Sequence, residues 1–252
     1  MEKTRTLVRP NVGQLIYNIS SYLHIMKESF MAVVLVATAL VGAAFAMPPS
    51  ERGAFQDENS ATFFDVVSIR DAVAAMPKAD LNESESEGLL YMREEEKLAR
   101  DVYWTFDDQY NLPVFENIAD AEETHMESVK VLMDKYGLSD PILEAGKFSN
   151  ADLQVLYDDL VAQGSSSEVE ALRVGAIIEE TDIQDLKDQL EKTDNEDITM
   201  VYESLMRGSR NHLRAFVNNL ERRGVDYMPL VLSQEEYDQI VNGSNETGPY
   251  QS

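Results

Sequence analysis

The sequence of residues 92–103 is MREEEKLARDVY, and its apolar residues recur three and four positions apart. This spacing is typical of a helix with one face in a protein core. Among the three consecutive glutamates, Glu95 has apolar neighbours at the helical spacings that share its face. We therefore expect Glu95 to point inward, and Glu94 and Glu96 to lie on a solvated face with local ion pairs.

The same kind of periodicity predicts further long helices, most of them introduced by a residue suited to a helix start. Capping boxes are expected at Ser84 with Glu87, Ser167 with Glu170 and Thr193 with Glu196, and Pro113 suits a first turn. The long helices are expected over residues 86–109, 114–135, 168–191 and 195–222.

The connection between the second and third long helices is about thirty residues long, which is enough to run back along a bundle. It contains a short helical stretch from Ser149 to Gln163, and another short helix is expected from Ser233 to Val241. The other two joints are short and predict antiparallel pairs. The sequence therefore predicts an all-α, four-helix bundle with a long crossover.

Several polar residues fall on the apolar faces of these helices, where an unpaired charge is costly. Glu122 and His125 are three residues apart, so they project from one helix turn. Four carboxylates brought together in a core repel one another unless protons or cations intervene. Divalent iron or manganese accepts mixed oxygen and imidazole ligands, so we expect a metal site. Its candidate ligands are Glu95, Glu122, His125, Glu179, Asp182 and His212.

Three segments carry a resemblance to a known family: residues 92–103, residues 122–125 (EETH) and residues 208–216 (GSRNHLRAF). Together they resemble an uncharacterised domain-of-unknown-function family of the ferritin-like superfamily, over roughly residues 84–240. Its relatives, the ferritins, bacterioferritins and rubrerythrins, hold two irons with a Glu, an E-x-x-H, another Glu and a second E-x-x-H. The resemblance therefore implies two iron ions as cofactors, with manganese as an alternative.

Carried over to this chain, that pattern selects Glu95, then Glu122 with His125, then Glu179 and His212. The chain departs from the pattern at Ser209, where a glutamate is expected. A serine offers only a hydroxyl, so we expect Asp182 to supply the missing carboxylate from the third helix.

The activity that the resemblance implies is oxidation of Fe(II) by oxygen or peroxide. Since the chain has no cysteine, a rubredoxin-like internal electron relay is excluded, and an external electron donor is required. Two alternatives stay open. One is a metal-binding or storage module without turnover, and the other is a metal-free bundle whose carboxylates pair with Arg210, Arg214 and the histidines. Tyr103 and Tyr202 are expected to be core or boundary residues.

The composition limits the partners of this domain. Acidic residues outnumber basic ones 46 to 21 in 252 residues, giving a formal charge of -25. This charge argues against nucleic acid, whose phosphates bind to lysine and arginine. The absence of cysteine excludes disulfides, iron–sulfur clusters and thiolate zinc sites. A homodimer stays open as an assembly.

The N-terminal part resembles an export signal. Residues 31–46 are apolar or small, follow Lys27 and end in Ala44-Phe45-Ala46, a pattern that signal peptidases cut. We expect cleavage after Ala46, with an uncleaved membrane anchor as the alternative, and in both cases an extracytoplasmic domain. Residues 47–83 are expected to be a flexible linker, 84–223 the bundle, and 224–252 a C-terminal extension.

Overall fold

The computed structural model describes residues 66–246, and the predicted export signal and its cleavage point lie outside this range. The described residues form seven helices and no strand, which confirms the all-α prediction. None of these helices is both long and apolar enough to cross a membrane. The helices are α2 (Val66–Ala75), α3 (Glu83–Tyr110), α4 (Pro113–Tyr136), α5 (Ala151–Gly164), α6 (Glu168–Leu190), α7 (Glu196–Glu221) and α8 (Gln234–Val241).

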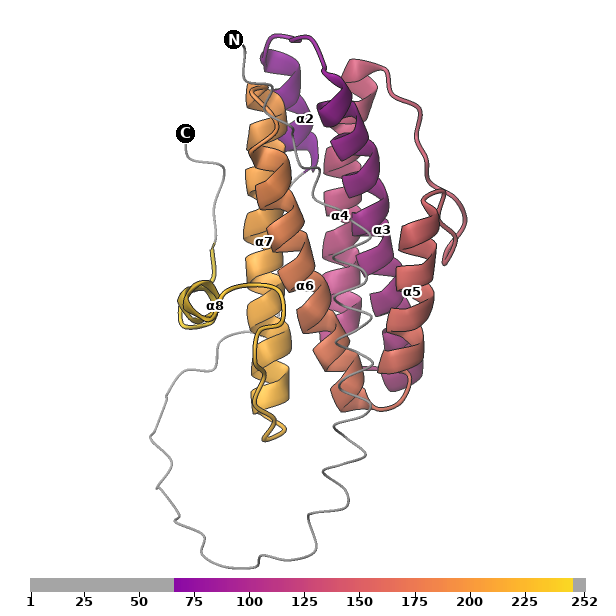
Figure 1. The fold of residues 1–252 in the computed structure, drawn as a ribbon, viewed down its shortest axis with the longest axis vertical. Coiled ribbons are helices and arrows are strands. Elements are labelled where there is room, and N and C mark those ends of the chain that lie inside the picture. Colours follow the sequence, from indigo (N-terminus) through magenta and orange to yellow (C-terminus); the bar gives the residue numbers. More distant parts are fainter. Residues whose placement is uncertain (1–65, 247–252) are drawn as a thin grey trace, which may run out of the picture. The chain divides into compact units, whose positions relative to one another are not determined.

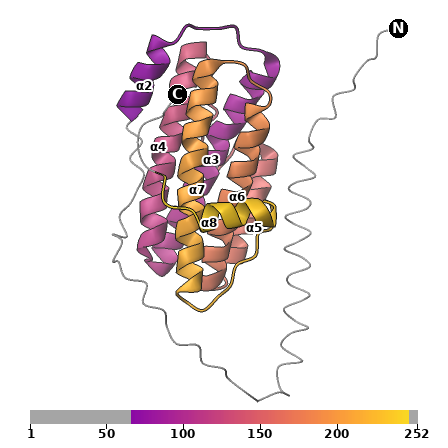
Figure 2. The same ribbon diagram turned by 90° about the vertical axis from the view of Figure 1, so that its left-hand side faces the viewer.

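The long helices lie side by side as two antiparallel hairpins, α3 with α4 and α6 with α7 (Figures 1 and 2). Contacts of α3 with α6 and of α4 with α7 join the hairpins. Between the hairpins, the chain runs along the outside of α3, and α5 packs against α3 and α6. Each of the four expected long helices is present, with ends a few residues or less from the expected ones.

The start of α3 differs from the predicted capping box. Asn82, rather than Ser84, is the N-cap, and its side chain accepts a 2.9 Å hydrogen bond from the backbone N–H of Glu85. The Glu85 carboxylate in turn accepts from the Asn82 N–H at 2.9 Å. The observed pair, Asn82 with Glu85, and the predicted pair, Ser84 with Glu87, both have the spacing of a capping box. The observed pair is favoured because the Glu85 carboxylate also accepts hydrogen bonds from Thr193 and Asn195, at the start of α7.

The other two predicted boxes have different outcomes. Ser167 caps α6 as expected and accepts from the Glu170 N–H at 3.2 Å. Thr193 is not a cap, since α7 begins after Asn195, whose N–H donates to the Thr193 hydroxyl at 3.1 Å. Thr193 therefore supports the turn before the helix rather than the helix itself.

Helix α3 has no solvated face along residues 92–103, because every residue in this stretch is buried. The crossover covers its outer side. Glu94 accepts hydrogen bonds from the backbone N–H groups of Ser149 and Asn150, and the Lys97 ammonium donates to the carbonyl of Lys147 at 3.1 Å. The expectation that Glu94 and Glu96 are solvated is therefore wrong.

Helix α2 lies within the stretch expected to be a linker. It packs against α4 and α7, with Ile69 and Val73 buried. The Lys135 ammonium donates to the carbonyls of Val73 and Met76 at the end of α2, at 2.9 and 3.1 Å. It also pairs with Asp197 of α7 at 2.6 Å, so one partly buried lysine joins three helices.

The docking of α2 can be tested by truncating one side chain. Val73 is 1% exposed, so Val73→Ala should lower the free energy of unfolding by about 1–3 kcal/mol through lost burial and a cavity. Val67, on the same helix, is 57% exposed, and Val67→Ala should change the free energy of unfolding by less than about 0.5 kcal/mol. Urea denaturation measures both values, and equal effects would contradict the observed packing of α2.

Candidate metal centre

The interior of the helical hairpins contains two histidines that face each other. His125 projects from α4, one turn after Glu122, and His212 projects from α7. The centroids of the two imidazole rings are 5.3 Å apart, and the ring planes differ by 27°. Both histidines and Glu122 are buried. Neighbouring helices from different hairpins thus bring together these three of the candidate ligands.

Carboxylates and imidazoles alternate along a row. One carboxylate oxygen of Glu122 lies 2.8 Å from Nδ1 of His125, and the other lies 2.9 Å from Nδ1 of His212. Beyond His125, the Glu96 carboxylate is 3.2 Å from the same nitrogen. Beyond His212, the Glu179 carboxylate is 3.4 Å from Nδ1. The row therefore has two halves, each with one histidine and one outer glutamate, that share Glu122.

The central three residues are spaced for metal binding. Potential ligand atoms of Glu122, His125 and His212 all lie within 4.8 Å of one another. Bonds to a metal ion are about 2.0–2.3 Å long, so two ligand atoms of one ion are separated by up to about 4–5 Å. The group is therefore compact enough to hold an ion with only small side-chain movements.

Several polar atoms around this row have no aligned hydrogen bond. They are Oε1 of Glu96, Oδ1 of Asp182 and Oε2 of Glu95. Buried polar atoms are nearly always satisfied, so a group of exceptions in one place requires an explanation. A bound cation satisfies carboxylate and imidazole lone pairs together, and the donor set therefore fits a metal.

Asp182 lies next to Ser209, the residue at which the chain departs from the ferritin-like pattern. The Ser209 hydroxyl donates a short hydrogen bond to one carboxylate oxygen of Asp182. It leaves the other oxygen, Oδ1, without a hydrogen bond. The structure thus places a carboxylate from α6 where α7 has only a hydroxyl.

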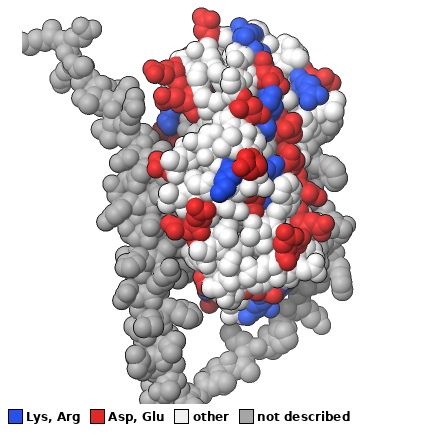
Figure 3. Space-filling model, turned by 90° about the vertical axis from the view of Figure 1, so that its right-hand side faces the viewer, with Lys and Arg blue, Asp and Glu red and all other residues white. Residues whose placement is uncertain are grey.

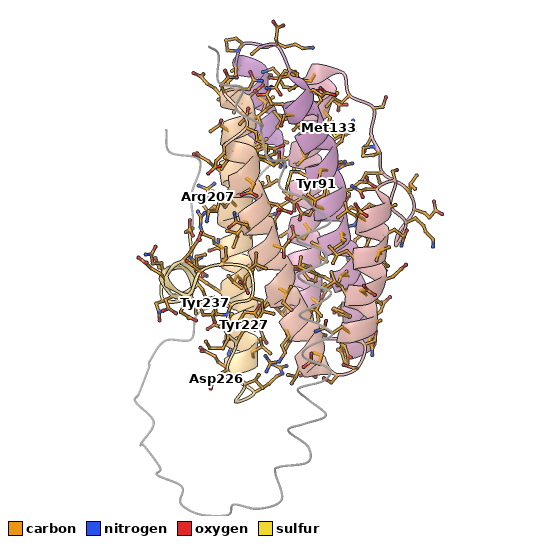
Figure 4. The ribbon with its side chains drawn as sticks, viewed as in Figure 1. Tyr91, Met133, Arg207, Asp226, Tyr227 and Tyr237 are labelled. Carbon is orange, nitrogen blue, oxygen red and sulfur yellow. The ribbon has the colours of Figure 1, made fainter. Side chains whose placement is uncertain are left out.

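Glu95 is buried as expected, but it lies beside Asp185 rather than in the row. The Tyr91 hydroxyl, on the same side of α3, donates to Asp185 at 3.2 Å (Figure 4). Glu96 contacts His125 in its place. Sequence analysis missed Glu96 and Asp185. The inward position of Glu96 could have been predicted from Tyr103, which lies seven residues later on the same face of α3 and whose hydroxyl also contacts the row.

Tyr103 supports the outer end of the row at Glu179. Its hydroxyl donates to the second carboxylate oxygen of Glu179 at 2.5 Å. The Tyr103 ring packs against Phe115 and Phe216, with centroids 6.4 and 5.1 Å away. Tyr103 is therefore a core residue that also orients a candidate ligand. Tyr202 is buried as well.

The arginines of the metal-free alternative do not pair with these carboxylates. Arg210 and Arg214 donate to Glu246 instead, at 2.8 and 2.9 Å. The charges in the row are compensated by the histidines and by protons. Burial acts to raise the pKa of Glu122, but His125 and His212 outweigh it and lower that pKa below its usual value.

The two outer glutamates of the row and His212 hold protons more tightly than usual. Burial raises the pKa of Glu96 to about 8, against the attraction of His125. Burial and repulsion from Glu122 raise the pKa of Glu179 to about 7. Burial opposes the charged form of His212, but Glu122 and Glu179 raise its pKa to about 9. Without a metal, protons on these groups balance the buried negative charge.

Comparison with known proteins identifies the family. A model described as "Uncharacterized protein domain (DUF2202)" matches residues 85–244, more than half of the chain, and the protein belongs to this family. The chain is 52% identical over 178 residues to "Uncharacterized protein MJ0754" of Methanocaldococcus jannaschii. That alignment covers 70% of this chain and 96% of the relative. The predicted membership of a domain-of-unknown-function family is thereby confirmed.

The fold is also similar to an experimental structure. The crystal structure of hypothetical protein MJ0754 from Methanococcus jannaschii DSM 2661 matches with a TM-score of 0.67 at 52% sequence identity. The match covers 68% of this chain and 99% of that chain. Nearly the whole of the relative therefore corresponds to about two thirds of this chain.

The raised pKa values predict how stability depends on pH in metal-free protein. In the folded protein Glu179, Glu96 and His212 release their protons near pH 7, 8 and 9, whereas Glu and His of the unfolded chain release them near about 4.3 and 6.5. The stability that these protons provide is lost as the pH rises through the folded pKa values. The midpoint of thermal unfolding should fall by roughly 5–10 °C over this range.

Circular dichroism melts of chelator-treated protein measure this dependence. Glu96→Gln keeps the shape of the protonated side chain and cannot ionise, so its melting midpoint should vary less with pH than that of the unaltered protein. A midpoint that stays constant or rises from pH about 6 to 9 would contradict the assigned proton positions.

Proposed function

We propose that this protein is a ferritin-like di-metal protein that binds two iron ions and oxidises Fe(II) with oxygen or peroxide, manganese being the alternative metal. The observation that supports it best is the row Glu96, His125, Glu122, His212 and Glu179, in which one carboxylate lies between two histidines. A carboxylate shared by two half-sites, each with one histidine and one glutamate, is suited to a pair of metal ions.

The helix arrangement supports the ferritin-like assignment. Ferritin-like folds connect two antiparallel helix pairs by one long crossover and place glutamate and histidine ligands on facing helices in the bundle core. Here α3 and α4 form one pair, α6 and α7 form the other, and the chain containing α5 connects them. The candidate ligands come from all four long helices.

Charge balance supports two divalent ions. Glu96, Glu122, Glu179 and Asp182 contribute four negative charges when ionised, and both histidines are neutral when they bind a metal. Two divalent cations would neutralise this set, which removes the cost of burying it. Glu96 and His125 would hold one ion, Glu179 and His212 the other, and Glu122 would serve both.

The residues around the row prepare it for reaction. Bound iron supplies the exchange of electrons with oxygen or peroxide. Tyr103 orients Glu179, and Ser209 orients Asp182, so neither carboxylate rotates freely. The burial of all six candidate side chains restricts water at the centre. In this reaction Fe(II) would supply the electrons that reduce oxygen or peroxide. Repeated turnover would therefore need either fresh Fe(II) or reduction of the Fe(III) by an external donor, since the chain has no cysteine for an internal relay.

A second candidate function is retention of metal without turnover. The formal charge of -25 favours it, and Figure 3 shows acidic side chains spread over one face, where they attract cations from solution. The two candidates share the same centre and differ in redox behaviour. The apolar segment at residues 31–46 favours an extracytoplasmic location for either, with or without signal cleavage, and a homodimer is compatible with both.

Anaerobic loading with Fe(II) tests the proposal. The protein should retain about two irons per chain after desalting, by elemental mass spectrometry, and its near-ultraviolet absorbance should change on exposure to oxygen. The double variant Glu122→Ala, His125→Ala should lose both properties. Asp120→Ala removes an exposed carboxylate of the same helix and should keep both.

Each outcome separates the candidate functions. Retained iron without a change in absorbance on oxygen or peroxide would leave metal storage as the better account. A folded protein that retains no iron, manganese or other divalent metal would contradict both candidates and favour a metal-free helical protein.

A further inference from the structure

The outer side of α7 carries a set of basic and amide side chains with no part in the metal centre. Arg207, Arg210, Asn211 and Arg214 are spaced three, one and three residues apart, so they share one helix face, here named the arginine face. Figure 4 shows Arg207 on the same side of α7 as α8, and Figure 2 shows α8 lying across α7. In a chain with 46 acidic and 21 basic residues, three arginines on one face are a local reversal of charge.

The arginine face binds one residue of the C-terminal segment through its carboxylate. Arg210 donates from Nε and Nη2 to the two carboxylate oxygens of Glu246, at 2.8 and 2.5 Å. Arg214 donates to the first of these oxygens at 2.9 Å. A paired contact of this kind is specific for the planar shape of a carboxylate.

The same face also binds the backbone of Glu246. The Asn211 side-chain amide donates to the Glu246 carbonyl at 2.9 Å, and its oxygen accepts from the Glu246 N–H at 2.9 Å. The N–H, the carbonyl and the carboxylate of a single residue are therefore all recognised. Any glutamate in an extended peptide segment presents these same three groups.

The recognising side chains are held in place by the protein. Arg214 and Asn211 are buried, and Arg214 donates to the Asn211 side chain at 2.6 Å and to the Ile240 carbonyl at 2.7 Å. Glu246 itself is partly exposed, with 29% of its side chain accessible. The binding groups are thus fixed by the fold, while their occupant lies at the surface at the end of the described chain.

Family membership separates the face from its occupant. Arg210 and Arg214 bind the Glu246 carboxylate, which also attracts Arg207. The matched family domain, residues 85–244, contains the whole arginine face, whereas Glu246 lies beyond it. The face therefore belongs to the family domain and the residue that fills it does not.

We propose that the arginine face is a binding site for an extended acidic peptide segment that presents a glutamate, and that Glu246 occupies it in cis. An acidic segment of another protein binds when the chain's own segment is displaced. The proposal is independent of the metal centre, since none of its contacts uses a candidate ligand.

A peptide binding experiment tests this site. The probe is a fluorescent peptide with the sequence of residues 242–250, NGSNETGPY, and its anisotropy is measured with the full chain carrying Glu246→Ala. The peptide should bind this variant at least about tenfold more tightly than the unaltered chain, because the tethered segment competes at a high effective concentration. Adding Arg210→Ala to the variant should abolish binding.

Matched controls define the specificity. Glu236→Ala removes a different C-terminal carboxylate, which pairs with Lys187, and this variant should behave like the unaltered chain. A peptide with glutamine in place of the glutamate should bind at least about tenfold more weakly, since it lacks the charged partner of two arginines.

Two results would overturn the proposal. One is absence of peptide binding to folded Glu246→Ala protein at up to roughly 1 mM peptide, the range in which a tethered ligand is effective. The other is equal binding of the glutamate and glutamine peptides. The far-ultraviolet circular dichroism spectrum of each variant verifies that the helices are intact.

Discussion

The carboxylate of Glu122 lies between His125 and His212 in a part of the protein that solvent barely reaches. A buried charge of this kind is tolerated only when oppositely charged or hydrogen-bonding partners compensate it. Removal of one partner leaves an uncompensated buried charge, which destabilises the fold. The two histidines come from α4 and α7, which belong to different hairpins. The register of these two helices, and through them the position of the hairpins, must therefore satisfy this contact.

The surroundings of the centre follow from the same constraint. Acidic side chains in a core repel one another unless they are far apart, protonated or neutralised by cations. In α3, consecutive glutamates have three separate tasks. Glu94 binds the backbone of the crossover, Glu95 lies beside Asp185, and Glu96 completes the row at His125. A helix with no solvated face can thus place each charge against a different neighbour, and the long connection between hairpins provides the cover that makes this possible.

The long helices and part of the centre were predictable because their polar and apolar residues are segregated. Glu122, His125 and His212 stand out on otherwise apolar faces, and the structure brings them together. The choice of Glu95 as a ligand depended on the assumption that α3 has a solvated side, which the crossover removes. Glu96 was recognisable only from its stripe with Tyr103, seven residues later. Helix α2 was missed because its docking depends on partners in α4 and α7 that are distant in the sequence.

Anomalous X-ray diffraction from crystals loaded with Fe(II) tests the central claim most directly, because it locates the metal without relying on activity. The account predicts two anomalous peaks inside the helices, one beside Glu96 and His125 and one beside Glu179 and His212, with Glu122 between them. Crystals of protein with intact helices that show no interior peak, or peaks only at surface carboxylates, would contradict it.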